Sequence, residues 1–187
     1  DRRTQSYERV KIVIVDDHAL FRVGIRGILQ QEPDLEVVAE ADDPRTALDA
    51  AFATNPDVIL MDLSLPSPGG IETTQRVKRE LPAAAIIVLS TEEDEDALFE
   101  AIKAGAAAFI LKDVGPDDLV TIIRRVVTGE YLINDKVFSK PAVASRVLKE
   151  FRELAVYGQE AAPIFAPLSP REVEVLVSAG DGRKDGD

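Results

Sequence analysis

The sequence predicts an α/β fold with a doubly wound parallel sheet, and three observations carry that prediction. Short apolar runs alternate with helix-length amphipathic segments five times within about 120 residues, the pattern of repeated strand–helix units. The runs Lys11–Val15 and Val58–Met61 are almost continuously apolar rather than alternating, which is typical of strands covered on both faces. Proline and glycine punctuate the helical segments, as Pro44 and Gly105 do.

Each element follows from its local pattern. The expected strands are Lys11–Val15, Glu36–Ala41, Val58–Met61, Ile86–Leu89 and Ala108–Leu111. The expected helices are Leu20–Gln31, Pro44–Ala53, Ile71–Glu80, Glu93–Ala104 and Pro116–Thr128. A five-stranded flavodoxin-like sheet of order 2-1-3-4-5 accommodates this sequence of elements, and it places the ends of the first and third strands side by side.

The chain divides into four expected regions. Residues 1–9 form an N-terminal arm, and 10–129 form the α/β domain. Residues 130–167 form a linker with a long helix, Ser139–Tyr157, that begins near Pro141. Its apolar stripe, at 144, 147, 151 and 154, is too short to indicate a coiled coil, so it is consistent with packing on its own domain or with pairing between chains. Residues 168–187 begin a further helix, with Ser169 as N-cap and Pro170 in the first turn.

Composition excludes several classes of function. The 187 residues contain no cysteine, so disulfides and thiolate metal sites are excluded, and the single histidine, His18, argues against a histidine-built zinc site. No apolar stretch is long enough to cross a bilayer, so a cytoplasmic protein is expected. The net charge of −12 opposes non-specific binding to nucleic acid.

Three aspartates provide the strongest indication of function. Asp16 and Asp17 directly follow the first predicted strand, and Asp62 follows the third. The carboxyl edge of a parallel sheet is where open α/β folds place their sites. Neighbouring carboxylates stay ionised together only at a cost unless a cation joins them, so the pattern predicts a Mg²⁺ site beside a reactive carboxylate.

Two further polar residues end strands at the same edge. Ser90 follows the fourth strand and Lys112 the fifth, adding a hydroxyl and an ammonium to the carboxylates. Such a set suits phosphoryl transfer, which depends on positioning and charge neutralisation, with an aspartate as nucleophile. Plainer interpretations stand beside this one: the Asp pair as a helix cap, Phe109 as a core aromatic, and His18 as a surface residue at a helix start.

In order along the chain, these motifs resemble those of the receiver domain of bacterial two-component response regulators. The segments that carry the resemblance are 15–25 (VDDHALFRVGI), 61–72 (MDLSLPSPGGIE), 87–90 (IVLS) and 109–113 (FILKD). The Asp-Asp-His opening and the Lys-Asp ending are similar to the NarL/FixJ branch. The resemblance covers about residues 9–129 and implies a CheY-like fold.

The resemblance also implies a role for each site residue. Asp62 would accept a phosphoryl group from a sensor histidine kinase. Asp17 would bind Mg²⁺ directly and Asp16 through water, with Asp62 and the Ser64 backbone carbonyl completing the protein ligands. Lys112 would pair with the phosphoryl group. Ser90 would hydrogen-bond that group and, with Phe109, would form the conformational switch.

The C-terminal region resembles the start of a LuxR-type helix-turn-helix. Residues 168–176 (LSPREVEVL) match its first helix, but no recognition helix follows. From residue 140 onward there are seven basic and eight acidic residues, so the expected excess of basic residues is missing. This chain alone should therefore bind DNA poorly, and no DNA-binding residue is assigned. The resemblance implies a protein that would regulate transcription, would be switched by phosphorylation and would form a homodimer. Its reactions would at most be self-phosphorylation and autodephosphorylation.

Two alternatives compete with this interpretation. A phosphatase of the haloacid dehalogenase type also uses Asp, Ser or Thr, Lys and an acidic pair. Here, however, the acidic pair precedes the nucleophile, and Ser64 stands where that family has its second aspartate. A receiver that acts as an interaction module without phosphorylation is the other alternative.

Overall fold

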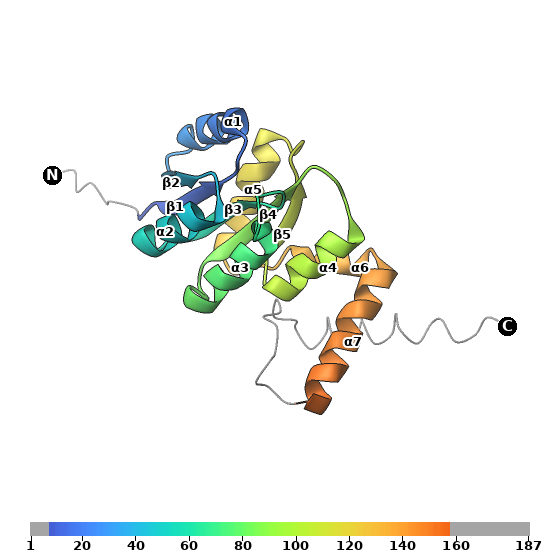
Figure 1. Cartoon of the computed structure of the whole chain (residues 1–187). Helices are drawn as coiled ribbons and strands as arrows, with labels where there is room; N and C mark the ends of the chain where they lie inside the picture. Colours follow the sequence, from blue (N-terminus) through green and yellow to red (C-terminus); the bar gives the residue numbers. More distant parts are fainter. Residues whose placement is uncertain (1–7, 158–187) are drawn as a thin grey trace.

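The strands of the computed structural model form one parallel sheet in the order β2-β1-β3-β4-β5 (Figure 1). The structure describes residues 8–157, so the expected helix after residue 168 lies outside the described residues. The strand bounds are β1 Val10–Val15, β2 Leu35–Ala41, β3 Val58–Asp62, β4 Ala85–Ser90 and β5 Ala108–Leu111. The predicted fold class and strand order are confirmed, and β1 pairs directly with β3.

Helices cover both faces of the sheet. They are α1 Ala19–Gln30, α2 Pro44–Thr54, α3 Gly69–Glu80, α4 Glu95–Ala104 and α5 Pro116–Val127. Alternate strand residues face opposite ways: Ile12 and Ile14 pack with α1 and α5, whereas Val13 and Val15 pack in the layer of α2, α3 and α4. The continuous apolar runs of the sequence are explained by this burial on both sides.

Local caps determine where several helices begin and end. The Asp43 carboxylate accepts a hydrogen bond from the Thr46 amide at the start of α2, and the Asp94 carboxylate accepts one from the Asp96 amide at the start of α4. Gly105 ends α4 with a φ of 90°, a left-handed conformation that suits glycine. Because Asp94 is the cap, α4 begins at Glu95, two residues later than predicted.

The region after α5 holds a short helix that the sequence analysis did not predict. Helix α6 spans Ile133–Phe138, and Ile133 and Val137 are both buried on its inner side. The Ile133 amide also donates a hydrogen bond to the carbonyl of Ala107, just before β5. A six-residue helix has too little periodicity to be recognised from its sequence, and here tertiary contacts supply its stability.

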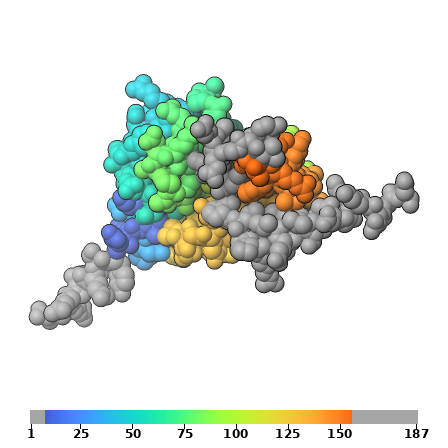
Figure 2. All heavy atoms as spheres, turned by 90° about the horizontal axis from the view of Figure 1, so that it is seen from below, coloured from blue at the N-terminus to red at the C-terminus, as the bar shows by residue number. Residues whose placement is uncertain are grey.

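The predicted long helix is confirmed as α7, Pro141–Tyr157, and it packs on α4 of its own domain. Val143, Ala144 and Val147 are buried in the same core as Phe99 and Ile102. Figure 2 shows the orange atoms of α7 at the side of the molecule away from the blue N-terminal atoms. The amino-terminal half of the apolar stripe is thus used within the chain.

A membrane-spanning helix is not present between residues 8 and 157, where every helix is too short or too polar to cross a bilayer.

Candidate functional site

The three aspartates meet at the carboxyl edge of the sheet. Asp16 follows β1 and Asp62 is the last residue of β3, and both side chains are fully buried. Asp17 lies beside them with 39% of its side chain exposed. The sequence prediction that these residues come together is confirmed because β1 and β3 are direct neighbours in the sheet.

A glycine holds the backbone of Asp62 in its place. A Cβ atom added to Gly70, in the first turn of α3, would lie 2.2 Å from the Asp62 carbonyl oxygen and 2.9 Å from the Cα atom of Leu63. No side chain fits in that space, so α3 can lie against the end of β3 only with glycine here. Gly70 is therefore needed for the close approach of α3 to the end of β3.

Lys112 brings a positive charge to the buried carboxylates. Its ammonium nitrogen lies 2.7 Å from Asp16 Oδ2 and 3.4 Å from Asp62 Oδ1, and only 12% of the side chain is exposed. Asp16 Oδ2 has no hydrogen bond of good geometry. We treat its contact with Lys112 as an ion pair, because 2.7 Å between opposite charges in a buried setting is strongly attractive whatever the angle.

The two oxygens of Asp62 have different surroundings. Oδ1 accepts hydrogen bonds from the backbone amide and the hydroxyl of Ser64, at 3.1 and 3.0 Å. Oδ2 is buried and has no hydrogen-bond partner. An unpaired buried carboxylate oxygen is costly, and it is the kind of atom that a cation or a covalent group would satisfy.

The cluster fits a divalent metal ion. One ligand atom each from Asp16, Asp17, His18 and Asp62 lies within 4.8 Å of all the others. Carboxylate oxygens are the protein ligands that Mg²⁺ prefers, and the unpaired Asp62 Oδ2 offers a further binding atom. The contribution of the Ser64 carbonyl stays a prediction.

Ser90 is the last residue of β4 and Phe109 lies within β5, and the contacts of both side chains are with other parts of the molecule. The Ser90 hydroxyl donates to the carbonyl of Glu92 at 2.7 Å and accepts from the Glu92 amide at 3.2 Å. Phe109 is 1% exposed and belongs to the core shared with α4, α6 and α7, with the ammonium of Lys136 5.8 Å from its ring centre. A switch role for either residue stays a prediction.

Two residues that the sequence analysis did not assign to the site also contact it. His18 is the N-cap residue of α1, as expected, but its ring nitrogen Nδ1 lies 2.9 Å from Asp16 Oδ1 and 3.1 Å from Asp17 Oδ1. The Arg22 guanidinium donates a hydrogen bond to the Asp16 carbonyl and pairs with Glu40. In the sequence, only its position next to the Asp pair could have indicated that His18 contacts the site. Nothing in the local pattern indicated the contacts of Arg22 with the Asp16 carbonyl and Glu40.

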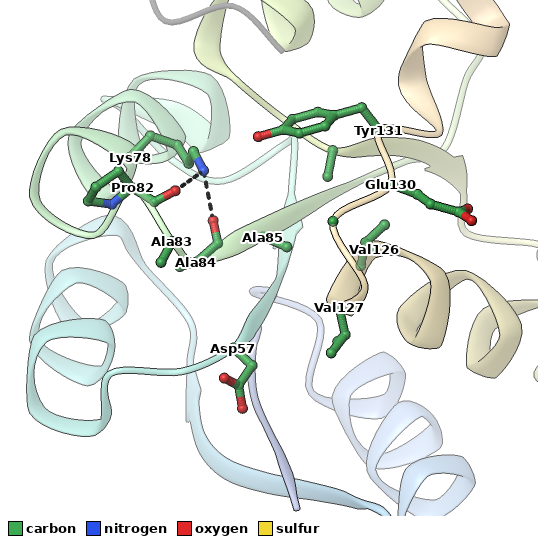
Figure 3. A pocket seen from close by; sticks show the side chains of 12 residues that line it. Asp57, Lys78, Pro82, Ala83, Ala84, Ala85, Val126, Val127, Glu130 and Tyr131 are labelled. Carbon is green, nitrogen blue, oxygen red and sulfur yellow. Dashed lines mark hydrogen bonds between the residues drawn. The ribbon is translucent and has the colours of Figure 1, made fainter. Parts of the chain in front are cut away.

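A partly open pocket of about 140 Å³ lies at the opposite edge of the sheet (Figure 3). Lys78 and Tyr131 line it, and Ala85 lies at the amino end of β4. The buried Lys78 ammonium donates to the carbonyls of Pro82 and Ala84, and burial lowers the pKa of that ammonium. None of the predicted site residues lines this pocket, whereas Asp16, Asp62 and Lys112 meet at the acidic cluster.

Known proteins with similar sequences and structures show which family this chain belongs to. Residues 12–124 match the family model of the response regulator receiver domain. The receiver domain of a NarL protein from Mycobacterium tuberculosis has a similar structure, with a TM-score of 0.64 and 33% sequence identity, over 66% of this chain and all of that one.

Two curated relatives extend the match beyond the receiver. The nitrate/nitrite response regulator NarP of Escherichia coli is 38% identical over 92% of this chain and 75% of its own length. The transcriptional regulatory protein DegU of Brevibacillus brevis is 37% identical over 78% of this chain, and the aligned part spans 59% of DegU. With its sheet topology, its acidic cluster and these relatives, the chain belongs to the response regulator receiver family, in the branch of NarL- and LuxR-type regulators.

Proposed function

We propose that Asp62 accepts a phosphoryl group from a sensor histidine kinase and that this chain is a phosphorylation-switched regulator. The observation that carries the proposal is the state of the Asp62 carboxylate. It is buried at a strand end, its Oδ2 has no hydrogen bond, and the Lys112 ammonium lies 3.4 Å from its Oδ1. Such a carboxylate is positioned and partly neutralised, as a nucleophile for phosphoryl transfer needs to be.

The reaction balances with the residues present. A carboxylate oxygen of Asp62 attacks the phosphorus of a phosphohistidine, a P–O bond forms, and the P–N bond breaks as the imidazole leaves and takes up a proton. The Lys112 ammonium lies beside both Asp16 and Asp62, and its flexible side chain can move to pair with the negative charge of the phosphoryl group on Asp62. Asp16 and Asp17 would hold Mg²⁺, which when bound neutralises charge on the transferred group.

Ser90 and Phe109 would transmit the change. The Ser90 hydroxyl is bound to Glu92 in this structure, and a phosphoryl group on Asp62 offers it a charged acceptor instead. If the Ser90 hydroxyl gave up its hydrogen bonds with Glu92, the loop before α4 would become freer to move. Helix α4 itself packs against Phe109 and α7. This chain would thus act as a signalling regulator whose only reactions are its own phosphorylation and dephosphorylation.

The natural output would be control of transcription in the cytoplasm. NarP is named a response regulator and DegU a transcriptional regulatory protein. By analogy, this protein would act as a homodimer and would bind DNA only through a complete helix-turn-helix domain, of which residues 168–187 resemble the beginning.

Labelling with acetyl phosphate tests the phosphoacceptor. With Mg²⁺ and acetyl phosphate, the wild-type chain should gain one phosphoryl group, and hydroxylamine should remove it because acyl phosphates are cleaved by that reagent. Asp62→Asn should gain none, because an amide oxygen is a poor nucleophile. Intact-mass spectrometry measures the added group.

Asp49→Asn is the matched control, since it makes the same chemical change at an exposed position of α2. It should label like the wild type. Equal labelling of Asp62→Asn and the wild type would disprove the assignment, whereas rapid release of phosphate from a small phosphomonoester would support the phosphatase alternative.

A further inference from the structure

We propose that His18 supplies a nitrogen ligand to the cation at the acidic cluster, so that the site prefers a first-row transition-metal ion such as Mn²⁺ over Mg²⁺. This inference rests on the proposed function, because the cation would be held by the same carboxylates. It goes further because it assigns a ligand and an ion preference to a residue outside the predicted metal set.

The distances around His18 match those within one coordination sphere. In an octahedral complex with bonds of about 2.1 Å, adjacent ligand atoms lie roughly 3.0 Å apart and opposite ones roughly 4.2 Å. His18 Nδ1 lies 2.9 Å from Asp16 Oδ1 and 3.1 Å from Asp17 Oδ1, which fits adjacent positions. Its distance of 3.9 Å from Asp62 Oδ2 approaches the opposite one.

The backbone directs the ring toward the carboxylates. The amide of His18 donates a hydrogen bond to Asp16 Oδ1 at 2.7 Å, so the residue turns back over the end of β1 before α1 begins. The side chain is 60% exposed. The ring is therefore largely open to solvent, while Nδ1 itself faces Asp16, Asp17 and the Lys112 ammonium, which lies 3.3 Å away.

A second, independent observation shows that the cluster lacks a partner. Asp62 Oδ2 is buried, has no hydrogen bond and lies on the side of the cluster that His18 occupies. Lys112 contacts the other oxygen of Asp62, so its charge does not satisfy Oδ2 directly. A cation held between Oδ2, Asp17 and His18 would satisfy this atom.

The donor set decides which cation is preferred. Mg²⁺ favours oxygen ligands and keeps several waters, whereas imidazole nitrogen suits later divalent ions and adds little for Mg²⁺. A site with three carboxylates and one imidazole therefore gains selectivity for Mn²⁺, Co²⁺ or Zn²⁺ that a site with oxygen donors alone lacks.

The test compares metal binding by the wild type and His18→Gln, both without any histidine tag. Calorimetry with Mn²⁺ and with Mg²⁺ gives the preference of each protein. We expect the ratio of Mn²⁺ to Mg²⁺ affinity to fall by about tenfold in His18→Gln, because the imidazole is lost while the carboxylates remain. Circular dichroism confirms that the variant is folded.

Pulsed electron paramagnetic resonance of bound Mn²⁺ provides a direct readout. His18 is the single histidine of the chain, so nitrogen modulation typical of imidazole has only one source. We expect that modulation in the wild type and its absence in His18→Gln.

An unchanged affinity ratio, or bound Mn²⁺ without the imidazole signal, would overturn the inference and leave His18 as a hydrogen-bond partner of Asp16. Failure of the wild type to bind either ion would overturn it as well. The proposed function is judged separately, by labelling of wild-type Asp62, which does not depend on His18.

Discussion

At the scale of single residues, the site depends on which atoms lack partners and on which spaces exclude side chains. Asp62 Oδ2 is buried without a hydrogen bond, while its other oxygen is held by Ser64. Gly70 lies against the Asp62 carbonyl where a Cβ does not fit. The Asp62 carboxylate is thus held in place by its backbone and by Ser64, while its buried Oδ2 has no hydrogen-bond partner.

Gly70→Ala should destabilise the fold by roughly 2 kcal/mol, because the added Cβ overlaps the Asp62 carbonyl and forces the backbone to shift. Chemical denaturation measures the free energy of unfolding. Gly24→Ala is the matched control, since nothing lies within 4 Å of its added Cβ in the middle of α1, and it should stabilise by about 0.5–1 kcal/mol. Equal effects of the two substitutions would contradict the packing argument.

Lys78 should make stability rise with pH in the alkaline range. Burial lowers the pKa of its ammonium in the folded chain below 10.5, the unfolded value, so between the two values the unfolded chain binds more protons. The free energy of unfolding therefore increases as pH rises through that window. Denaturation of Lys78→Met should lack this increase, whereas the exposed Lys149→Met should retain it. A wild-type slope identical to that of Lys78→Met would refute the assignment.

At the scale of elements, ion pairs join α6 and α7 to the loop and helix that follow Ser90. Glu93 pairs with Lys136 at 3.4 Å, and Asp96 pairs with Arg146 at 2.6 Å. The Arg146 guanidinium also lies 4.0 Å from the ring centre of Phe99 in α4. Two carboxylates of the acidic run 92–96, those of Glu93 and Asp96, thus have partners within their own chain.

Arg146→Ala should loosen α7. The ion pair is exposed and weak by itself, and stacking on Phe99 brings the expected loss to about 1 kcal/mol, or roughly fivefold faster amide exchange in 141–157. Hydrogen–deuterium exchange with mass spectrometry measures this. Arg152→Ala, at an exposed position of the same helix, should leave exchange unchanged. Comparable acceleration by both substitutions would point to helix propensity rather than to the contact with α4.

At the scale of the whole molecule, a short series of contacts leads from the end of β4 to α6. Ser90 ends β4 beside the cluster, its hydroxyl binds Glu92, and the neighbouring Glu93 holds α6. A change at Asp62 that draws the Ser90 hydroxyl away from Glu92 would therefore disturb the contacts that fasten α6 and α7.

Phosphorylation of Asp62 should accordingly speed amide exchange in 133–157. Beryllofluoride with Mg²⁺, as a stable mimic of the phosphoryl group, allows exchange to be compared with the untreated protein. Ser90→Ala should still bind the mimic but show a smaller acceleration, because the hydroxyl that links the two sites is missing. Full acceleration in Ser90→Ala, or none in the wild type, would show that the path runs elsewhere.

The sequence by itself determined the sheet order and which strand-end residues gather at the acidic cluster. Apolar runs covered on both faces require a parallel sheet, and the residue after each run then lies at one edge, as Asp16 and Lys112 do. Element boundaries came within two residues, since caps such as Gly105 act locally.

Only the tertiary structure decided the contacts that depend on how elements pack. It brought the ring of His18 to within 3.9 Å of the Asp62 carboxylate, buried Ile133 and Val137 to form α6, and packed the amino-terminal half of the α7 stripe on its own α4. These outcomes depend on distances between segments far apart in sequence, which no local pattern encodes. Hence the sequence indicated which residues gather at the acidic cluster, and packing decided which neighbours contact them.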